Sequence, residues 1–134
     1  MQLLGFDYGL KNIGTATGQT LTGTATSQPP LRARDGVPDW SEVEALLREW
    51  QPELVLVGLP LNMDGTESEL SARARKFAKR IHGRFGVAVE MVDERLSSFE
   101  AKGEVMARGG SRDYGKNPVD SIAARLIVET FLNR

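Results

Sequence analysis

The feature that most constrains the fold is a short apolar segment at the start of the chain that ends in an acid and a glycine turn. Residues 2–6 read Gln-Leu-Leu-Gly-Phe, and Asp7 and Gly9 follow closely. An apolar run of this length is typical of a strand buried inside a sheet. A carboxylate at its end is costly to bury unless it is paired, hydrogen-bonded or bound to a metal. Asp7 therefore either caps its own turn, the common use of Asp beside Gly, or belongs to a polar site.

Composition indicates an ordinary globular protein and excludes several kinds of site. The chain has 134 residues, 40% of them hydrophobic and 26% charged, so we expect residues 1–134 to form one domain with a sizeable core. It has no cysteine and a single histidine, His82, which excludes thiolate metal sites and makes a catalytic triad or a histidine zinc site improbable. No run is long enough to cross a bilayer and no signal sequence is visible, so we expect a cytoplasmic location. With a formal net charge of −1, any nucleic-acid binding must depend on a local basic patch.

Hydrophobic periodicity predicts a mixed sheet with helices packed on it. After the first strand, residues 13–17 and 20–26 read as strands joined by a turn at Gly18 and Gln19, and the proline-rich residues 27–38 read as a loop. The later elements predicted are a helix capped by Asp39 or Ser41, a strand at 54–57, a helix from a Thr66–Glu69 capping box to about His82, a strand at 87–92, a helix over about 97–107 and a last helix capped by Asn117. We expect an α/β fold with a five-stranded mixed sheet.

Polar residues follow three of the predicted strands, and another acid opens the last helix. They are Asp7, Asn62, Asp64, Asp93 and Glu94, with Asp120 in the first turn of the last helix. Ligands bind such sheets beyond the carboxyl ends of the parallel strands, so all these side chains can reach one edge. Carboxylates without His or Cys suit Mg²⁺ or Mn²⁺, and two such ions about 3.5–4 Å apart support phosphodiester cleavage. Each acid also has an ordinary structural role: Asp93 can pair with Arg95, Glu94 can be a strand-end charge, and Asp120 suits the helix dipole.

Four blocks of sequence resemble the signature motifs of the YqgF (RuvX-type) nuclease family. In the family's order, they are Asp-Tyr-Gly-Leu-Lys-Asn-Ile-Gly at 7–14, Val-Gly-Leu-Pro-Leu-Asn-Met-Asp-Gly at 57–65, Asp-Glu-Arg-Leu-Ser-Ser at 93–98 and Val-Asp-Ser-Ile-Ala-Ala at 119–124. The resemblance implies an RNase H-like fold and a metal-dependent nuclease. Together with the strand pattern, it predicts that residues 2–7 lie at the centre of the sheet between 13–17 and 53–57. Members are described as Holliday junction resolvases and as nucleases that mature the 5′ end of pre-16S rRNA. Carried over by motif, Asp7, Glu94 and Asp120 are the catalytic, metal-binding acids. The chain has Asn12 where the family usually has Arg, which puts one phosphate or structural contact in question but not the acids.

Two groups of basic residues are candidates for contacting nucleic acid. Residues 108–116 form a polar, glycine-rich loop that leads directly into the last helix, and Lys11 lies close behind Asp7. The loop offers Arg108, Arg112 and Lys116 for phosphate and Tyr114 for base stacking, although a solvated linker is equally compatible with its composition. A second group, Arg73, Lys76, Arg80 and Arg84, recurs at helical spacing. We interpret this stripe as complementing the helix dipole, with acids near the start and bases near the end.

The leading hypothesis is an endonuclease that uses Mg²⁺ or Mn²⁺ on structured nucleic acid, either a four-way DNA junction or a precursor rRNA. The sugar kinase/actin/Hsp70 ATPases share the fold and a first strand that ends in Asp-x-Gly, but they need two lobes around the nucleotide, and this chain has room for one. The other alternative is a non-catalytic RNase H-like module that binds nucleic acid in ribosome biogenesis. The intact acids argue against that module, and the weak overall basicity argues slightly for it.

Overall fold

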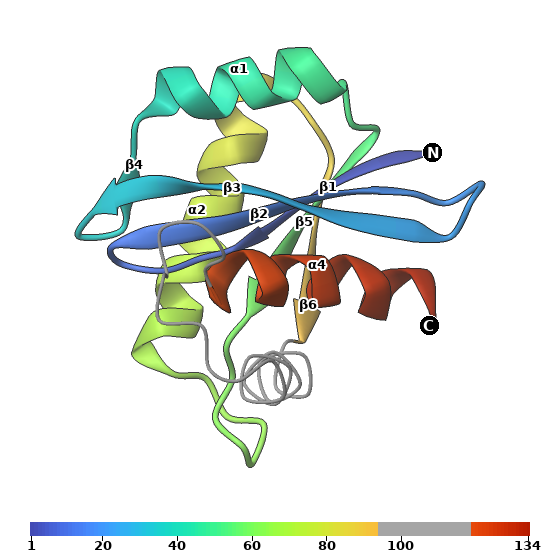
Figure 1. The fold of residues 1–134 in the computed structure, drawn as a ribbon. Coiled ribbons are helices and arrows are strands. Elements are labelled where there is room, and N and C mark those ends of the chain that lie inside the picture. Colours follow the sequence, from blue (N-terminus) through green and yellow to red (C-terminus); the bar gives the residue numbers. More distant parts are fainter. Residues whose placement is uncertain (94–118) are drawn as a thin grey trace.

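The computed structural model describes residues 1–93 and 119–134 of the chain, with side chains described for 1–93 and 121–134 (Figure 1). The elements in chain order are β1 (Gln2–Asp7), β2 (Asn12–Gln19), β3 (Thr24–Arg34), β4 (Val37–Pro38), α1 (Trp40–Trp50), β5 (Leu54–Leu59), α2 (Glu69–Phe85), β6 (Val89–Asp93) and α4 (Val119–Leu132). The helix predicted over about 97–107 and the predicted Asn117 cap lie outside the described residues.

The strands form one mixed sheet in the order β4-β3-β2-β1-β5-β6. β1 pairs antiparallel with β2 and parallel with β5, and β5 pairs parallel with β6. The prediction that residues 2–7 lie in the interior of the sheet, between the second strand and the strand at 54–59, is confirmed. The predicted count of five strands is wrong, because the described residues form six.

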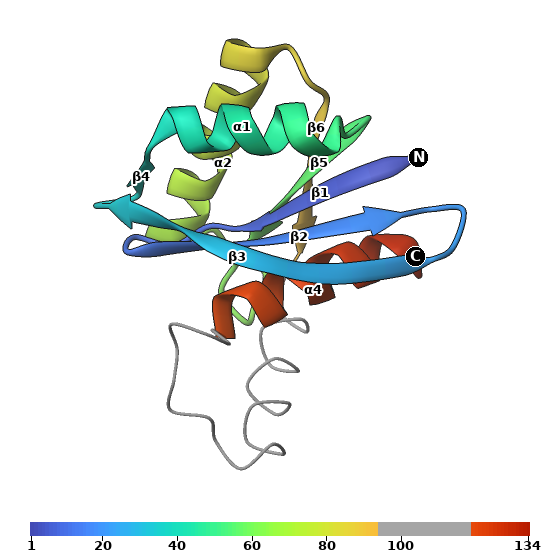
Figure 2. The same cartoon turned by 45° about the horizontal axis from the view of Figure 1, so that its top comes forward.

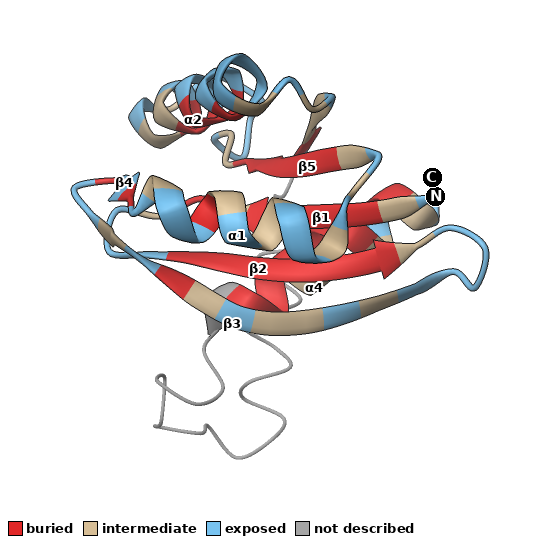
Figure 3. Cartoon of the chain, turned by 90° about the horizontal axis from the view of Figure 1, so that it is seen from above, coloured by how far each residue is buried: buried red, intermediate tan, exposed pale blue. Residues whose placement is uncertain are grey.

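Helices cover both faces of the sheet, with α1 and α2 on one side and α4 on the other (Figures 1 and 2). Successive side chains of a strand point to opposite faces, so β1 contributes to both layers. Leu4 and Phe6 pack with Val43 of α1 and Phe77 of α2, whereas Leu3 packs on the α4 side. Figure 3 shows β1, β2 and β5 as the most continuously buried part of the sheet. The core therefore consists of two apolar layers that share β1.

Glycines let α4 approach the sheet closely. A Cβ atom added to Gly5 would lie 2.5 Å from Val128 Cγ2 and 3.4 Å from Ala124 O, and Gly18 of β2 faces Val128 in the same way. Real Cβ atoms almost never make contacts that short, so neither position can carry a larger residue unless the Val128 side chain or the helix shifts. The absence of these two side chains thus sets how near α4 lies to β1 and β2.

The structure corrects the prediction for residues 20–38. The turn of the first hairpin is at 20–23, not at Gly18 and Gln19, and β3 continues through residues that were predicted to be a loop. Pro29 and Pro30 are tolerated because β3 has no further partner strand beside them, and because the register shifts between Ile13 and Thr15 on β2. Prolines on an edge strand cost no ladder hydrogen bond.

A tight turn creates the sixth strand. Asp35 and Gly36 have φ angles of 50° and 81°, which is the left-handed pair that a two-residue hairpin needs. The turn brings Val37 and Pro38 back against Arg34 and Ala33 as the short strand β4. Asp39 then caps α1 by accepting a hydrogen bond from the Ser41 backbone N–H at 2.9 Å, so Asp39 is the cap among the two predicted candidates.

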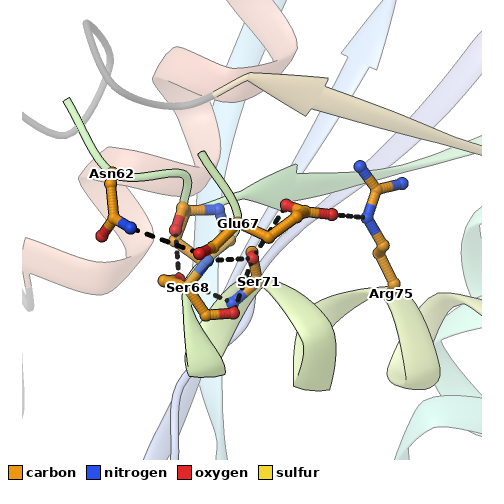
Figure 4. Close-up of polar contacts among 6 residues, drawn as sticks. Asn62, Glu67, Ser68, Ser71 and Arg75 are labelled. Carbon is orange, nitrogen blue, oxygen red and sulfur yellow. Dashed lines mark hydrogen bonds and ion pairs between the residues drawn. The ribbon is translucent and has the colours of Figure 1, made fainter. Parts of the chain in front are cut away.

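The α2 helix begins two residues later than the capping box predicted from Thr66 and Glu69 (Figure 4). Ser68 is the cap: its Oγ accepts from Ser71 N at 2.9 Å, and Ser71 Oγ accepts from Ser68 N at 2.7 Å. Glu67 lies just outside the helix, where its carboxylate accepts hydrogen bonds from Arg75 Nε and from Ser71 Oγ. The hydrogen bond from Arg75, followed by that from Ser71, lowers the pKa of Glu67 below its ordinary value of 4.5.

We expect Gly5→Ala to destabilise the protein by about 1–3 kcal/mol, the usual cost of forcing extra volume into a packed core. Gly83→Ala is the matched control, because a Cβ there would have no atom within 4 Å and alanine favours the helix. Urea denaturation of both variants measures the effect. A Gly5→Ala variant that unfolds at the parent's urea concentration would contradict the close approach of α4.

We expect the Glu67 carboxylate to stabilise the α2 start in a pH-dependent way. Because its folded pKa is lowered, the stabilisation is complete above the unfolded value near 4.5 and is lost as the pH falls through the folded pKa. Glu67→Gln should therefore lower the urea midpoint at pH 7 more than at pH 3. Glu53→Gln, at an exposed acid just before β5, is the control. A loss for Glu67→Gln that is equal at both pH values would rule out this contribution.

Candidate active site

Asp7 is the last residue of β1 and lies at the carboxyl end of the central strand. It pairs with Gly14 of β2 and is half-buried. Alternation along β1 places it on the same face as Leu3 and Gly5, which is the face covered by α4. The strand continues into a tight turn, where a Cβ on Gly9 would collide with the Asn12 carbonyl oxygen. The backbone therefore holds Asp7 on a rigid strand rather than in a mobile loop.

The beginning of α4 docks beside this end of β1. Ser121 is buried; its Oγ donates to the Gln28 carbonyl at 2.8 Å, and Ser27 Oγ donates to the Ser121 carbonyl at 3.1 Å. Gln28 pairs with Thr15, which pairs with Phe6, the residue before Asp7. The backbone of Asp120, one residue before Ser121, thus lies at the predicted edge of the sheet. The Asp120 side chain is outside the described part.

Ser121, whose hydrogen bonds position this helix, was not among the residues predicted from the sequence. Its hydroxyl reaches β3 across a sequence separation of 93 residues, and the Ser27 hydroxyl bonds back to its carbonyl. The available signal was a small polar residue at the edge of an apolar helical stripe, within the block at 119–124. A buried hydroxyl of this kind is costly unless it finds a partner, which indicates a fixed contact.

Glu94 directly follows β6 and is outside the described residues. The end of β6 is nevertheless defined, because Asp93 pairs with Leu59 of β5, while Val57 of β5 pairs with Phe6 of β1. These three strands are parallel, so their carboxyl ends meet at one edge, with β6 about 10 Å from β1 across two strand spacings. Asp7 and Asp93, the residue before Glu94, therefore lie at the same end of the sheet.

Asn62 and Asp64, which were expected at the same edge, hold the loop between β5 and α2. Asn62 Nδ2 donates to Thr66 Oγ1 at 3.0 Å and to the Glu67 carbonyl at 3.2 Å (Figure 4). Asp64 Oδ1 accepts from the Thr66 N–H at 3.0 Å and from its hydroxyl at 2.7 Å. These contacts give both side chains a structural role in shaping the loop.

The predicted nucleic-acid contacts are only partly described. Lys11 is exposed in the β1–β2 turn, and its carbonyl oxygen accepts a hydrogen bond from Ala33 N at 2.8 Å. Asn12, the departure from the family's usual Arg, is the exposed first residue of β2. The remaining predicted contacts, Arg108, Arg112, Tyr114 and Lys116, lie outside the described residues.

The predicted metal ligands stay a prediction. Among the side chains that the structure describes, no three His, Asp or Glu residues gather as metal ligands, but the Glu94 and Asp120 side chains are not among these. Asp7 offers the carboxylate oxygens that hard cations prefer, at a position where two further acids can converge.

Among the helices that the structure describes, none is long and apolar enough to span a membrane.

The fold resembles two solved Holliday junction resolvases. One is T. thermophilus RuvC in complex with a Holliday junction substrate, with a TM-score of 0.56, 19% identity and coverage of 95% of this chain and 91% of that one. The other is a fowlpox virus resolvase in complex with Holliday junction DNA, with a TM-score of 0.57, 14% identity and coverage of 99% and 97%. At these identities the likeness shows the fold, and the predicted RNase H-like class is confirmed.

Sequence comparison identifies the family. Residues 1–134 match the family model described as "RuvX: Holliday junction resolvase". A Marinobacter nauticus protein named "Putative pre-16S rRNA nuclease" is 64% identical over 130 residues, which cover 97% of this chain and 91% of that protein. A Pseudomonas putida protein of the same name is 60% identical over 131 residues, with coverage of 97% and 93%. The predicted family is therefore confirmed: the chain belongs to the RuvX family of Holliday junction resolvases and is a nuclease.

Proposed function

We propose that this nuclease is a metal-dependent endonuclease, with Asp7, Glu94 and Asp120 as the acids of one active site. The observation that carries the proposal is the position of Asp7. It ends a strand that is hydrogen-bonded on both sides, on the face where the first turn of α4 docks through Ser121. A site for a hard cation needs several carboxylate oxygens together, and acids drawn from three distant segments would supply them.

The residues of the chain bind and orient, and Mg²⁺ or Mn²⁺ supplies the chemistry. When bound, one or two such ions lower the pKa of an attacking water and stabilise the leaving oxygen of the phosphodiester. Asp7 holds its carboxylate at a fixed point because β2 and β5 hold its strand. The N-terminal end of α4 carries a partial positive charge that favours an anionic group at this edge. Lys11, four residues after Asp7, is placed to contact a backbone phosphate.

The proposed substrate is structured nucleic acid in the cytoplasm. The curated relatives at 60–64% identity are named for pre-16S rRNA, so a precursor of 16S rRNA is the first substrate to test. The solved resolvases of the same fold were captured with four-way DNA junctions, which makes such a junction the second. The alternative is a non-catalytic module that binds RNA or DNA. It would have the same fold, and only the catalytic use of the three predicted acids distinguishes the endonuclease from it.

We expect Asp7→Asn to reduce cleavage at least about 100-fold while the fold is kept. Even removing a group that only supports a metal ligand costs about 10–100-fold, and Asn keeps the shape of Asp while losing its charge. Glu94→Gln and Asp120→Asn should act in the same direction without adding to it, because one site would hold all three. Cleavage of both substrates over a Mn²⁺ titration measures the loss, beside urea denaturation of each variant.

Glu53→Gln is the matched control, because Glu53 lies at the opposite edge of the sheet, where its N–H donates to the Gln2 carbonyl at 2.9 Å. It should cleave at the parent's rate. If Asp7→Asn cleaves as fast as the parent at every Mn²⁺ concentration, the catalytic assignment of Asp7 is wrong. A parent protein that binds both substrates and cleaves neither at any Mn²⁺ concentration would instead favour the binding module.

A further inference from the structure

A cavity of about 260 Å³ lies on the α2 side of the sheet, and its lining includes Tyr8, the residue that follows Asp7. Three aromatic residues, Tyr8, Trp40 and Phe77, and three basic residues, Arg73, Lys76 and Arg80, contribute to its lining. The aromatic rings pack on one another: the Tyr8 and Phe77 centroids are 5.1 Å apart, and those of Trp40 and Phe77 are 5.9 Å apart. The cavity is smaller than the usual 300–1,000 Å³ of a small-molecule site, which favours a small charged group of a larger ligand.

The helix dipole does not explain these basic residues. In the 17-residue α2 helix, only His82 and Arg84 are basic residues of the last turn, where the dipole favours positive charge. Arg73, Lys76 and Arg80 all lie before that turn. Lys76 and Arg80 are exposed, and within the described part of the chain neither forms an ion pair. Like charges at four-residue spacing repel each other, so this pair does not help α2 to fold, and both side chains are accessible to an anionic ligand.

Of the four basic residues at helical spacing on α2, Arg73 and Arg84 are held in place by contacts with other elements. Arg73 Nη1 donates to Asp35 Oδ1 at 3.2 Å. The Arg84 guanidinium carbon lies 4.4 Å from the centre of the Trp40 ring, a cation–π contact that orders the side chain. Neighbours at three- and four-residue spacing on a helix are about 5–6 Å apart, so the four basic residues form a continuous row along α2.

The row is tied directly to the strand end that carries Asp7. Tyr8 Oη donates to the Gly36 carbonyl at 3.0 Å, and Gly36 N donates to the Leu10 carbonyl at 2.8 Å. Through the same turn, Asp35 accepts from Arg73. The β3–β4 turn therefore connects the residues directly after Asp7 to the first basic residue of the row.

We propose that Arg73, Lys76, Arg80 and Arg84 form a track that binds the phosphate backbone of the nucleic acid beyond the scissile bond. The proposal deepens the proposed function, since it assumes that the edge at Asp7 holds the scissile phosphate. Backbone phosphates take Lys and Arg contacts without regard to base sequence, which suits a row of Lys and Arg side chains. Among the described residues that line the cavity, Asp35 is the one carboxylate; it pairs with Arg73 and would repel a bound phosphate.

Loss of the two exposed members should weaken binding in a salt-dependent way. In an Asp7→Asn background, which prevents turnover, we expect Lys76→Gln with Arg80→Gln to lower affinity for an RNA stem–loop about 10–100-fold at 0.1 M salt. The slope of log affinity against log salt should become shallower by about 1.4–1.8, since each phosphate contact contributes about 0.7–0.9. Asp35→Asn should change affinity in the opposite direction, because it removes a negative charge and frees Arg73.

The matched control removes the same charge elsewhere. Lys79→Gln with Arg48→Gln takes one exposed cation from α2, on the side that faces β6, and one from α1, where Arg48 pairs with Glu44. If the track binds phosphate, this control keeps the parent's salt slope. If both double variants lose the same affinity and slope, net charge is responsible and the track does not exist.

Trp40 gives a readout that does not depend on cleavage. The chain has two tryptophans, so Trp50→Phe leaves Trp40 as the only one. We expect its emission to change on titration with the RNA stem–loop, and the change to weaken when Lys76 and Arg80 are neutral. Unchanged emission at saturating RNA would overturn the proposal. Because binding is measured without turnover, cleavage by the parent protein separately decides the proposed function.

Discussion

The structure depends on the burial of β1 on both of its faces. Leu4 and Phe6 pack under α1 and α2, Leu3 packs under α4, and the strand is hydrogen-bonded to β2 and β5 along both edges. Each of these large side chains contributes about 1.5–3 kcal/mol by leaving water. Because the strand is packed on both faces and hydrogen-bonded on both sides, its position and register are fixed. The backbone position of its last residue, Asp7, is therefore fixed as well.

The elements that pack against β1 determine which residues surround the candidate site. Gly5 leaves room for α4 to lie close to β1, and Ser121 fixes the helix start through its hydrogen bonds to β3. On the other face, Tyr8 and the Asp35–Gly36 turn connect the same strand end to the basic residues of α2. The carboxyl end of β1 thus lies between two helical layers, α4 with Asp120 in its first turn and α2 with its basic residues (Figure 1).

Elements with strong periodicity could be predicted from the sequence, including β1, its central place and the apolar stripe of α4. Residues 27–34 could not, because Pro29 and Pro30 are typical of loops and only the open side of β3 makes them acceptable in a strand. The α2 cap is Ser68 and not the predicted Thr66, because Ser68 and Ser71 each accept a hydrogen bond from the other's backbone N–H. The role of the α2 cations depends on their tertiary position near Tyr8 and Trp40, which spacing along one helix does not reveal.

The most direct test of the central claim is where a divalent cation binds. Titrating the protein with Mn²⁺ and following its amide NMR signals reports proximity to the bound ion residue by residue. If the acids gather at the carboxyl end of β1, line broadening will be greatest at Asp7, Tyr8 and Ser121 and will spare Glu53 at the opposite edge. Broadening centred elsewhere, with the signals of Asp7 and Ser121 unaffected, would contradict the account.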